Sequence, residues 1–169
     1  AMILGPRIGR YTNKTVNAIP GHSLTLGALG VFILWFAWYG FNCGSTTTGT
    51  YEIGLIAVNT ALAPAAAALS ALAFSYKLYK TFDIGLVLNG ILAGLVGVTA
   101  GCASIEPWAA VVIGLTSGII VIVSIRLLDR FEIDDGGRFP HGVVGDAIKL
   151  GCGGRLGGGR ASFDGRRER

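Results

Sequence analysis

Four long runs of apolar residues restrict what this chain can fold into. They cover residues 24–43, 53–76, 84–104 and 108–128, and only the last contains a charged side chain. A helix needs about 20 mostly apolar residues to cross the hydrocarbon core of a bilayer. Lipid offers no hydrogen-bond partners to the backbone, so runs that do not alternate polar and apolar residues must be helical there. We therefore predict an all-α, polytopic membrane helix bundle with four spanning helices.

The overall composition excludes an ordinary soluble domain. Charged residues make up 14% of the chain and hydrophobic residues 51%, with a mean hydropathy of +0.60. Soluble domains carry about 25% charged residues, and a soluble core could not hide this much apolar sequence. The cysteines Cys43, Cys102 and Cys152 form no C-x-x-C motif and no disulfide framework, so we interpret them as small apolar residues.

The chain divides into a membrane part and a tail. We expect residues 1–135 to form a membrane domain and residues 136–169 to form an irregular tail rich in glycine and arginine. The tail has no spanning run, and no G-K-[ST] completes its GCGGRLGGGR segment as a phosphate loop. We interpret it as a flexible tail, or as sequence read out of frame, and expect no nucleic-acid partner.

The charges of the loops predict an orientation. Basic residues accumulate in alternate loops, and positive charge stays on the cytoplasmic side of a membrane. We therefore expect residues 5–20, 77–83 and 129–139 to be cytoplasmic and residues 45–52 and 104–107 to be external. The basic residues concerned are Arg7, Arg10, Lys14, Lys77, Lys80, Arg126 and Arg130, whereas the alternate loops carry Glu52 and Glu106.

Glycines repeat within the apolar runs at a spacing that favours close helix packing. The G-x-x-x-G pattern lets two helix backbones approach each other. It predicts a tightly packed bundle rather than isolated membrane anchors. Ser23, directly before the first run, is the predicted N-cap of its helix. The four pairs are Gly40–Gly44, Gly90–Gly94, Gly97–Gly101 and Gly114–Gly118.

A polar and aromatic patch at the outer end of the first run is the candidate site. Trp38, Phe41 and Ser45 are spaced by three and four residues, so they share one face of a helix. One interpretation is an aromatic belt at the membrane interface. The other is a vestibule for a small cation, with aromatic faces that attract the charge and a hydroxyl that accepts a hydrogen bond from it.

The remaining polar residues indicate no enzyme. His141 is either a loop residue or a functional one, because a lone histidine near a membrane edge fits both interpretations. The chain shows no catalytic triad, no H-E-x-x-H motif and no carboxylate pair inside a run. We therefore expect no catalytic residues, no metal site and no cofactor.

Three stretches of this sequence resemble the Amt/Mep/Rh ammonium transporter family. WYGFNCGS at residues 38–45 resembles the end of the family's sixth span, and NGILAGLVGVTAGC at residues 89–102 resembles its eighth. The Asp134–Asp135 pair followed by His141–Gly142 resembles the start of its tenth span. The chain then covers roughly the sixth to ninth of about eleven spans, so the resemblance implies a partial transporter.

The resemblance implies a role for each candidate residue. Trp38 lines the pore, Phe41 is one of the stacked phenyl gates below the external vestibule, and Ser45 hydrogen-bonds the recruited ammonium. His141 matches the second of two pore histidines. The first histidine, the other phenyl gate and the vestibule's second tryptophan and aspartate belong to the family's earlier spans.

The resemblance also implies the protein's setting. It predicts ammonium or ammonia as the substrate, with methylammonium as its analogue, and a multi-pass protein of the plasma membrane that serves nitrogen uptake. It further implies a homotrimer at full length and a cytoplasmic regulator of the PII type. Two alternatives stay open, which are an ammonium-sensing receptor of the same fold and a nonfunctional truncated fragment.

Overall fold

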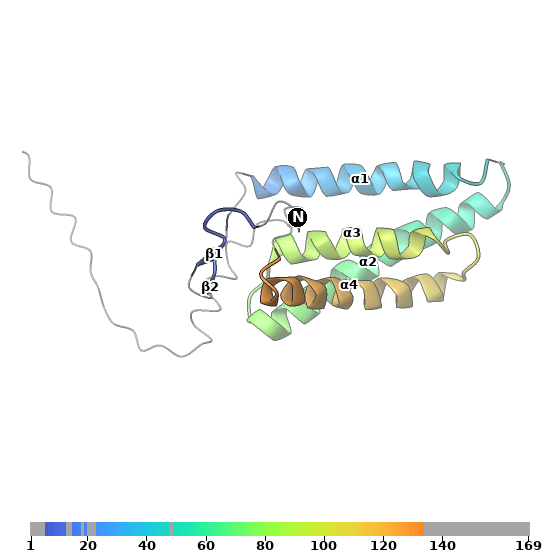
Figure 1. Ribbon diagram of the computed structural model, residues 1–169. Helices are drawn as coiled ribbons and strands as arrows, with labels where there is room; N and C mark the ends of the chain where they lie inside the picture. Colours follow the sequence, from blue (N-terminus) through green and yellow to red (C-terminus); the bar gives the residue numbers. More distant parts are fainter. Residues whose placement is uncertain (1–5, 13–14, 18, 20–22, 48, 134–169) are drawn as a thin grey trace, which may run out of the picture.

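A computed structural model describes residues 6–12, 15–17, 19, 23–47 and 49–133. In this part the chain forms four helices, which run up and down in sequence order, and a small hairpin before the first helix (Figure 1). Helices occupy all four apolar runs, as an all-α membrane bundle requires. The elements are β1 (Tyr11–Thr12), β2 (Thr15–Val16), α1 (Leu24–Gly44), α2 (Glu52–Tyr79), α3 (Ile84–Thr99) and α4 (Pro107–Arg130).

Three of the four helices are long and apolar enough to cross a membrane, namely α1, α2 and α4. The remaining helix, α3, is shorter than the apolar run at residues 84–104 from which it was predicted. It has 16 residues and ends at Thr99. The chain then turns through residues 100–104. The amide of Asn59 on α2 donates to the carbonyl oxygens of Cys102 and Ile105, both at 2.9 Å. The side chain of Asn59 thus satisfies two carbonyls of the turn, which have no backbone partner of their own helix there.

Side-chain caps fix where two of the helices begin. The Leu26 N–H donates to Ser23 Oγ at 3.2 Å, which confirms the predicted N-cap of α1. The buried carboxylate of Asp83 accepts from the N–H groups of Gly85 at 2.8 Å and Leu86 at 3.3 Å at the start of α3. The cap also brings negative charge to the positive end of the helix dipole.

The two ends of the bundle differ in charge. One end holds the hairpin, the turn between α2 and α3, and the C-terminal end of α4 (Figure 1). The other end holds the connections from α1 to α2 and from α3 to α4. All the loops predicted to be cytoplasmic thus gather at one end within the described residues. Glu52 and Glu106 lie at the opposite end, at the starts of α2 and α4.

The helices α3 and α4 meet α2 at glycines. A Cβ placed on Gly94 would lie 2.7 Å from Pro64 Cα and 2.8 Å from the Ala63 oxygen. A Cβ placed on Gly114 would overlap the same Ala63 carbonyl. Only glycine permits this approach of one helix backbone to another. In lipid the main attraction between helices is dispersion, which such close contact strengthens.

The glycine pairs of the sequence do not all have this role. Gly90–Gly94 of α3 and Gly114–Gly118 of α4 face α2, and this agrees with the predicted close packing. By contrast, a Cβ on Gly40 or Gly44 would meet nothing within 4 Å. This pair, at the C-terminal end of α1, therefore packs no helix among the described residues.

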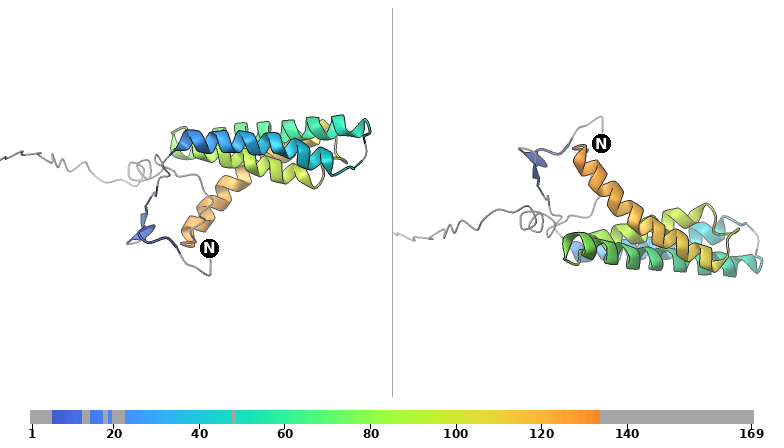
Figure 2. Two further views of the ribbon diagram at one scale, coloured as in Figure 1. Left: turned by 90° about the horizontal axis from the view of Figure 1, so that it is seen from above. Right: turned by 90° about the horizontal axis from the view of Figure 1, so that it is seen from below.

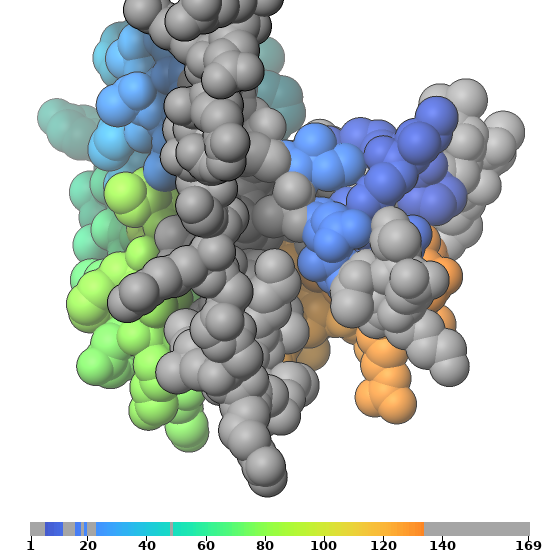
Figure 3. All heavy atoms as spheres, turned by 90° about the vertical axis from the view of Figure 1, so that its left-hand side faces the viewer, coloured from blue at the N-terminus to red at the C-terminus, as the bar shows by residue number. Residues whose placement is uncertain are grey.

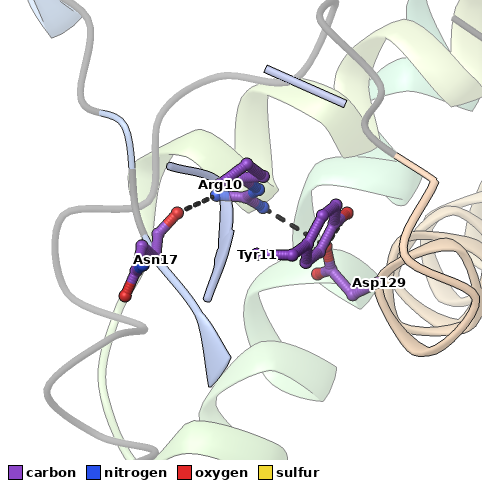
Figure 4. Close-up of polar contacts among 4 residues, drawn as sticks. All are labelled: Arg10, Tyr11, Asn17 and Asp129. Carbon is purple, nitrogen blue, oxygen red and sulfur yellow. Dashed lines mark hydrogen bonds and ion pairs between the residues drawn. The ribbon is translucent and has the colours of Figure 1, made fainter. Parts of the chain in front are cut away.

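The loop before α1 is joined to the end of α4 by an ion pair (Figure 4). Arg10, only 7% exposed, places Nη2 3.2 Å from Asp129 Oδ1, and Tyr11 Oη lies 3.4 Å from the same oxygen. Arg10 Nη1 also donates to the Asn17 carbonyl at 2.7 Å, which closes the hairpin. Figure 2 shows that α4 turns obliquely away from the other helices toward this hairpin. In the end-on view the blue residues before α1 lie beside the orange end of α4 (Figure 3).

The close approach at Gly114 predicts the effect of a single methyl group. We expect Gly114→Ala to lower the free energy of unfolding by about 1–3 kcal/mol, because the helices must separate to admit the Cβ. Unfolding of the chain in mixed detergent micelles, followed by far-UV circular dichroism, measures the change. Gly30→Ala is the control, since a Cβ at Gly30 meets nothing within 4 Å. An equal effect of both substitutions would contradict this account of the packing.

The ion pair predicts how the hairpin responds when a charge is removed. We expect Asp129→Asn to lower the local stability of the hairpin by about 1–2 kcal/mol, because a nearly buried guanidinium then faces a neutral acceptor. Hydrogen exchange of the Asn17 amide, which donates to the Arg10 carbonyl at 2.8 Å, reports the opening. Glu52→Gln is the control, because it also removes one negative charge but lies exposed at the other end of the bundle. Unchanged exchange in Asp129→Asn would show that the pair does not hold the hairpin.

Candidate functional site

The candidate site lies at the C-terminal end of α1, on the side predicted to be external. Trp38 and Phe41 belong to the last two turns of the helix, and Ser45 is its C-cap. Ser45 Oγ donates to the Phe41 carbonyl at 2.6 Å. The hydroxyl hydrogen is therefore directed at the helix. Since Ser45 is exposed, its oxygen keeps lone pairs that can accept a hydrogen bond from an N–H cation.

The two aromatic rings lie close together but differ in burial. The centroids of Trp38 and Phe41 are 5.9 Å apart, and the ring planes are tilted by 58°. Trp38 is half-buried and packs against the apolar cluster of Val31, Leu88, Ile91 and Leu95. Phe41 is 60% exposed. One ring is thus held by the bundle and the other projects from it.

The two rings border an open depression of about 510 Å³ on the surface of α1. Aromatic faces carry partial negative charge, so rings at this spacing attract a small cation. Ser45 lies one helical turn beyond Phe41. The depression offers an apolar wall with one hydroxyl near it, and no carboxylate lines it. Its lining residues are Leu34, Ala37, Trp38, Gly40 and Phe41.

Hydrogen bonds between helices fix the position of this end of α1. Trp38 Nε1 donates to Thr99 Oγ1 on α3 at 2.8 Å. Asn42, 3% exposed, donates through Nδ2 to Thr60 Oγ1 on α2 at 2.9 Å. Both acceptor hydroxyls donate in turn to carbonyls of their own helices, at 2.7 Å each. The site wall is therefore tied to two other helices by polar bonds in apolar surroundings.

Neither Thr60 nor Thr99 was predicted to hold the site, and Asn42 was predicted only as a member of the polar and aromatic patch. Asn42, Thr60 and Thr99 are polar residues inside apolar runs, and such residues usually face the interior of a bundle and carry a role. That signal was present in the sequence and could have found them. It could not have shown which residues pair, because the pairs join positions 18 and 61 residues apart.

The fourth predicted site residue, His141, lies outside the described residues. Among the described residues, the structure places Trp38, Phe41 and Ser45 together at the C-terminal end of α1. Within the described residues no group of three or more His, Cys, Asp or Glu side chains could hold a metal ion.

Comparison with known proteins decides the family. The sequence profile of the Ammonium Transporter Family matches residues 1–146. The chain belongs to this family. It is 44% identical over 148 residues to the ammonium transporter Amt2 of Archaeoglobus fulgidus, which covers 85% of this chain and 32% of that protein. The chain is thus part of a multi-pass membrane protein fold, and it spans about a third of the length of the curated relatives it matches.

Solved structures show the same helix arrangement. A structure named Sensor Amt Protein superposes with a TM-score of 0.77 at 39% identity and covers 87% of this chain and 35% of that one. Mep2 from Candida albicans superposes with a TM-score of 0.72 at 29% identity, over 87% of this chain and 31% of that one. The four helices therefore have the arrangement of part of an Amt/Mep protein.

The buried amide of Asn59 generates a prediction about the turn beside the site. We expect Asn59→Ala to raise the labelling rate of Cys102 by a maleimide about tenfold, because two hydrogen bonds that hold residues 100–105 are lost. Cys102 is only 6% exposed in the intact turn. Mass spectrometry of the labelled chain in micelles gives the rate at this residue.

Asn89→Ala is the matched control for this experiment. Asn89 lies on α3, and its side-chain NH₂ has no hydrogen-bond partner in the described part of the chain. Its removal should leave the labelling of Cys102 unchanged. Similar rates for Asn59→Ala and the unmodified chain would mean that the turn holds its shape without the amide.

Proposed function

We propose that the protein containing this chain moves ammonium across the plasma membrane, and that Trp38, Phe41 and Ser45 form part of its external cation-recruiting vestibule. The observation that supports this best is the shared wall at the outer end of α1, with two rings 5.9 Å apart and an exposed hydroxyl beyond them. The membership of the family and the names of its relatives support the substrate.

The chemistry of the wall suits ammonium. An ammonium ion cannot enter an apolar pore without losing most of its hydration energy, which is very costly. The rings of Trp38 and Phe41 offset part of that cost at the mouth, and Ser45 replaces one hydrogen bond to water. Deprotonation then lets neutral ammonia pass the apolar stretch. Potassium has no proton to lose, so the same route rejects it.

The remaining parts of the proposal rest on the family rather than on the described residues. His141, as one of two pore histidines, supplies hydrogen bonds to ammonia inside the pore and a route for the proton. The full-length protein is a homotrimer in the plasma membrane and responds to a cytoplasmic regulator of the PII type. No catalytic or cofactor chemistry belongs to the proposal.

A sensing role is the second candidate. The observation that favours it is the superposition on a structure whose name describes a sensor. A receptor of this fold would bind ammonium at the same wall and signal through its cytoplasmic loops. It would bind methylammonium without carrying it, and a nonfunctional fragment would do neither.

Methylammonium uptake tests the proposal. In vesicles that hold the full-length protein containing this chain, we expect Trp38→Leu to raise the apparent KM for methylammonium about tenfold. Ser45→Ala should act in the same direction, because the acceptor oxygen is lost. Trp108→Leu is the control. This exposed tryptophan donates to Glu106 Oε2 at 2.7 Å and does not line the depression. Uptake no faster than in empty vesicles would refute transport, and binding without uptake would support the sensor.

A further inference from the structure

We propose that Thr99 on α3 is a positioning residue that makes the wall selective for cations. Thr99 accepts the hydrogen bond of the Trp38 indole N–H inside the bundle. The ring carbons of Trp38, rather than a hydrogen-bond donor, then border the depression. The inference rests on the proposed function, because it assigns to Thr99 a part in recruiting ammonium at that wall.

The geometry makes Thr99 an obligate acceptor. Its hydroxyl donates to the Leu95 carbonyl at 2.7 Å, one turn back along α3. The hydroxyl hydrogen is therefore occupied, and Oγ1 can only accept. Trp38 Nε1, which can only donate, meets this oxygen at 2.8 Å. Two consecutive bonds of this kind polarise and strengthen each other in apolar surroundings.

The bond decides which part of the indole faces the site. The N–H edge of an indole is its positive end, and the face of the ring is its negative part. A cation beside the N–H edge is repelled, while a cation over the ring face is attracted. Because Nε1 donates to Thr99 on α3, the depression that Trp38 borders meets no free indole N–H.

A second tryptophan at the same end of the bundle shows the contrast. Trp108 Nε1 donates to Glu106 Oε2, two residues away in the chain, and its ring is 66% exposed. That bond joins no two helices. The bond from Trp38 crosses from α1 to α3, 61 residues apart, and the half-buried ring packs on an apolar cluster. The inward N–H of Trp38 is thus a feature of the bundle rather than of tryptophans at this end.

The test combines two measurements, the NMR signal of the Trp38 indole N–H and the kinetics of methylammonium uptake. The chain has three tryptophans, so ¹⁵N-labelled indole groups give three N–H signals that Trp→Phe variants assign. In this chain in nanodiscs, Thr99→Val should shift the Trp38 signal and leave the Trp108 signal in place. Thr99→Ser, which keeps the hydroxyl, should return the Trp38 signal close to its original position.

The kinetic reading uses the full-length protein containing this chain. Thr99→Val should raise the apparent KM for methylammonium about five- to tenfold, with the maximal rate nearly unchanged, as expected from one lost hydrogen bond. Thr99→Ser should restore the KM. Thr116→Val is the control, because the Thr116 hydroxyl bonds only carbonyls of its own helix.

Other outcomes overturn the inference and can be told apart from a failure of the proposed function. An unmoved Trp38 signal in Thr99→Val refutes the role of Thr99. The same conclusion follows if Thr99→Val leaves the KM unchanged while Trp38→Leu raises it. Neither outcome contradicts transport. A fall in maximal rate with an unchanged KM would mean that Thr99 only supports the fold. If the wild-type protein neither takes up nor binds methylammonium, the proposed function fails and the role of Thr99 at the wall fails with it.

Discussion

The contact of backbone with backbone along α2 is the constraint on which the rest of the structure depends. Alanines on α2 meet glycines on α3 and α4 so closely that a Cβ on Gly94 or Gly114 would collide with main-chain atoms. In lipid the hydrophobic effect does not drive helices together, so close packing has to do so. Because α2, α3 and α4 pack in this way, they form a frame against which other parts of the molecule take their positions.

The helix that carries the candidate site is held differently. Val31 and Asn42 are its buried residues, while Leu26, Phe32 and Phe36 are each more than half exposed. Its outer end is fixed by the bonds of Trp38 to α3 and of Asn42 to α2. Directional bonds specify rotation about the helix axis, which apolar contacts alone do not. The site wall is therefore oriented by hydrogen bonds while the frame behind it is assembled by packing.

The fold could largely be predicted from the sequence, because a bilayer restricts the answer. Long apolar runs can only be helices there. Loop charges predict which helix ends share a side of the membrane. The early end of α3 could not be predicted, since it depends on the Asn59 amide, which lies more than 40 residues away from the carbonyls it satisfies. The ion pair of Arg10 with Asp129 joins positions 119 residues apart and leaves no local pattern.

The candidate site was predictable to a lesser degree, and for a related reason. The spacing of Trp38, Phe41 and Ser45 predicts one helical face, and in the structure the rings of Trp38 and Phe41 lie 5.9 Å apart with Ser45 as the C-cap of the same helix. Spacing along one helix cannot show which atoms of a side chain remain available. That Trp38 has its N–H bound to Thr99, 61 residues away, follows only from the assembled helices.

Magnitudes indicate what this wall can and cannot do. A cation over an exposed ring gains about 0.5–1 kcal/mol, and roughly 2 kcal/mol when water is excluded. Removing an ion from water costs many times more. Phe41 is 60% exposed, so a cation at this wall alone keeps most of its hydration. The wall can therefore attract and orient a small cation, but a selective entrance requires other residues that cover the wall and replace the remaining water. The curated relatives are about two and a half times as long as this chain, and their additional residues are the natural source of that cover.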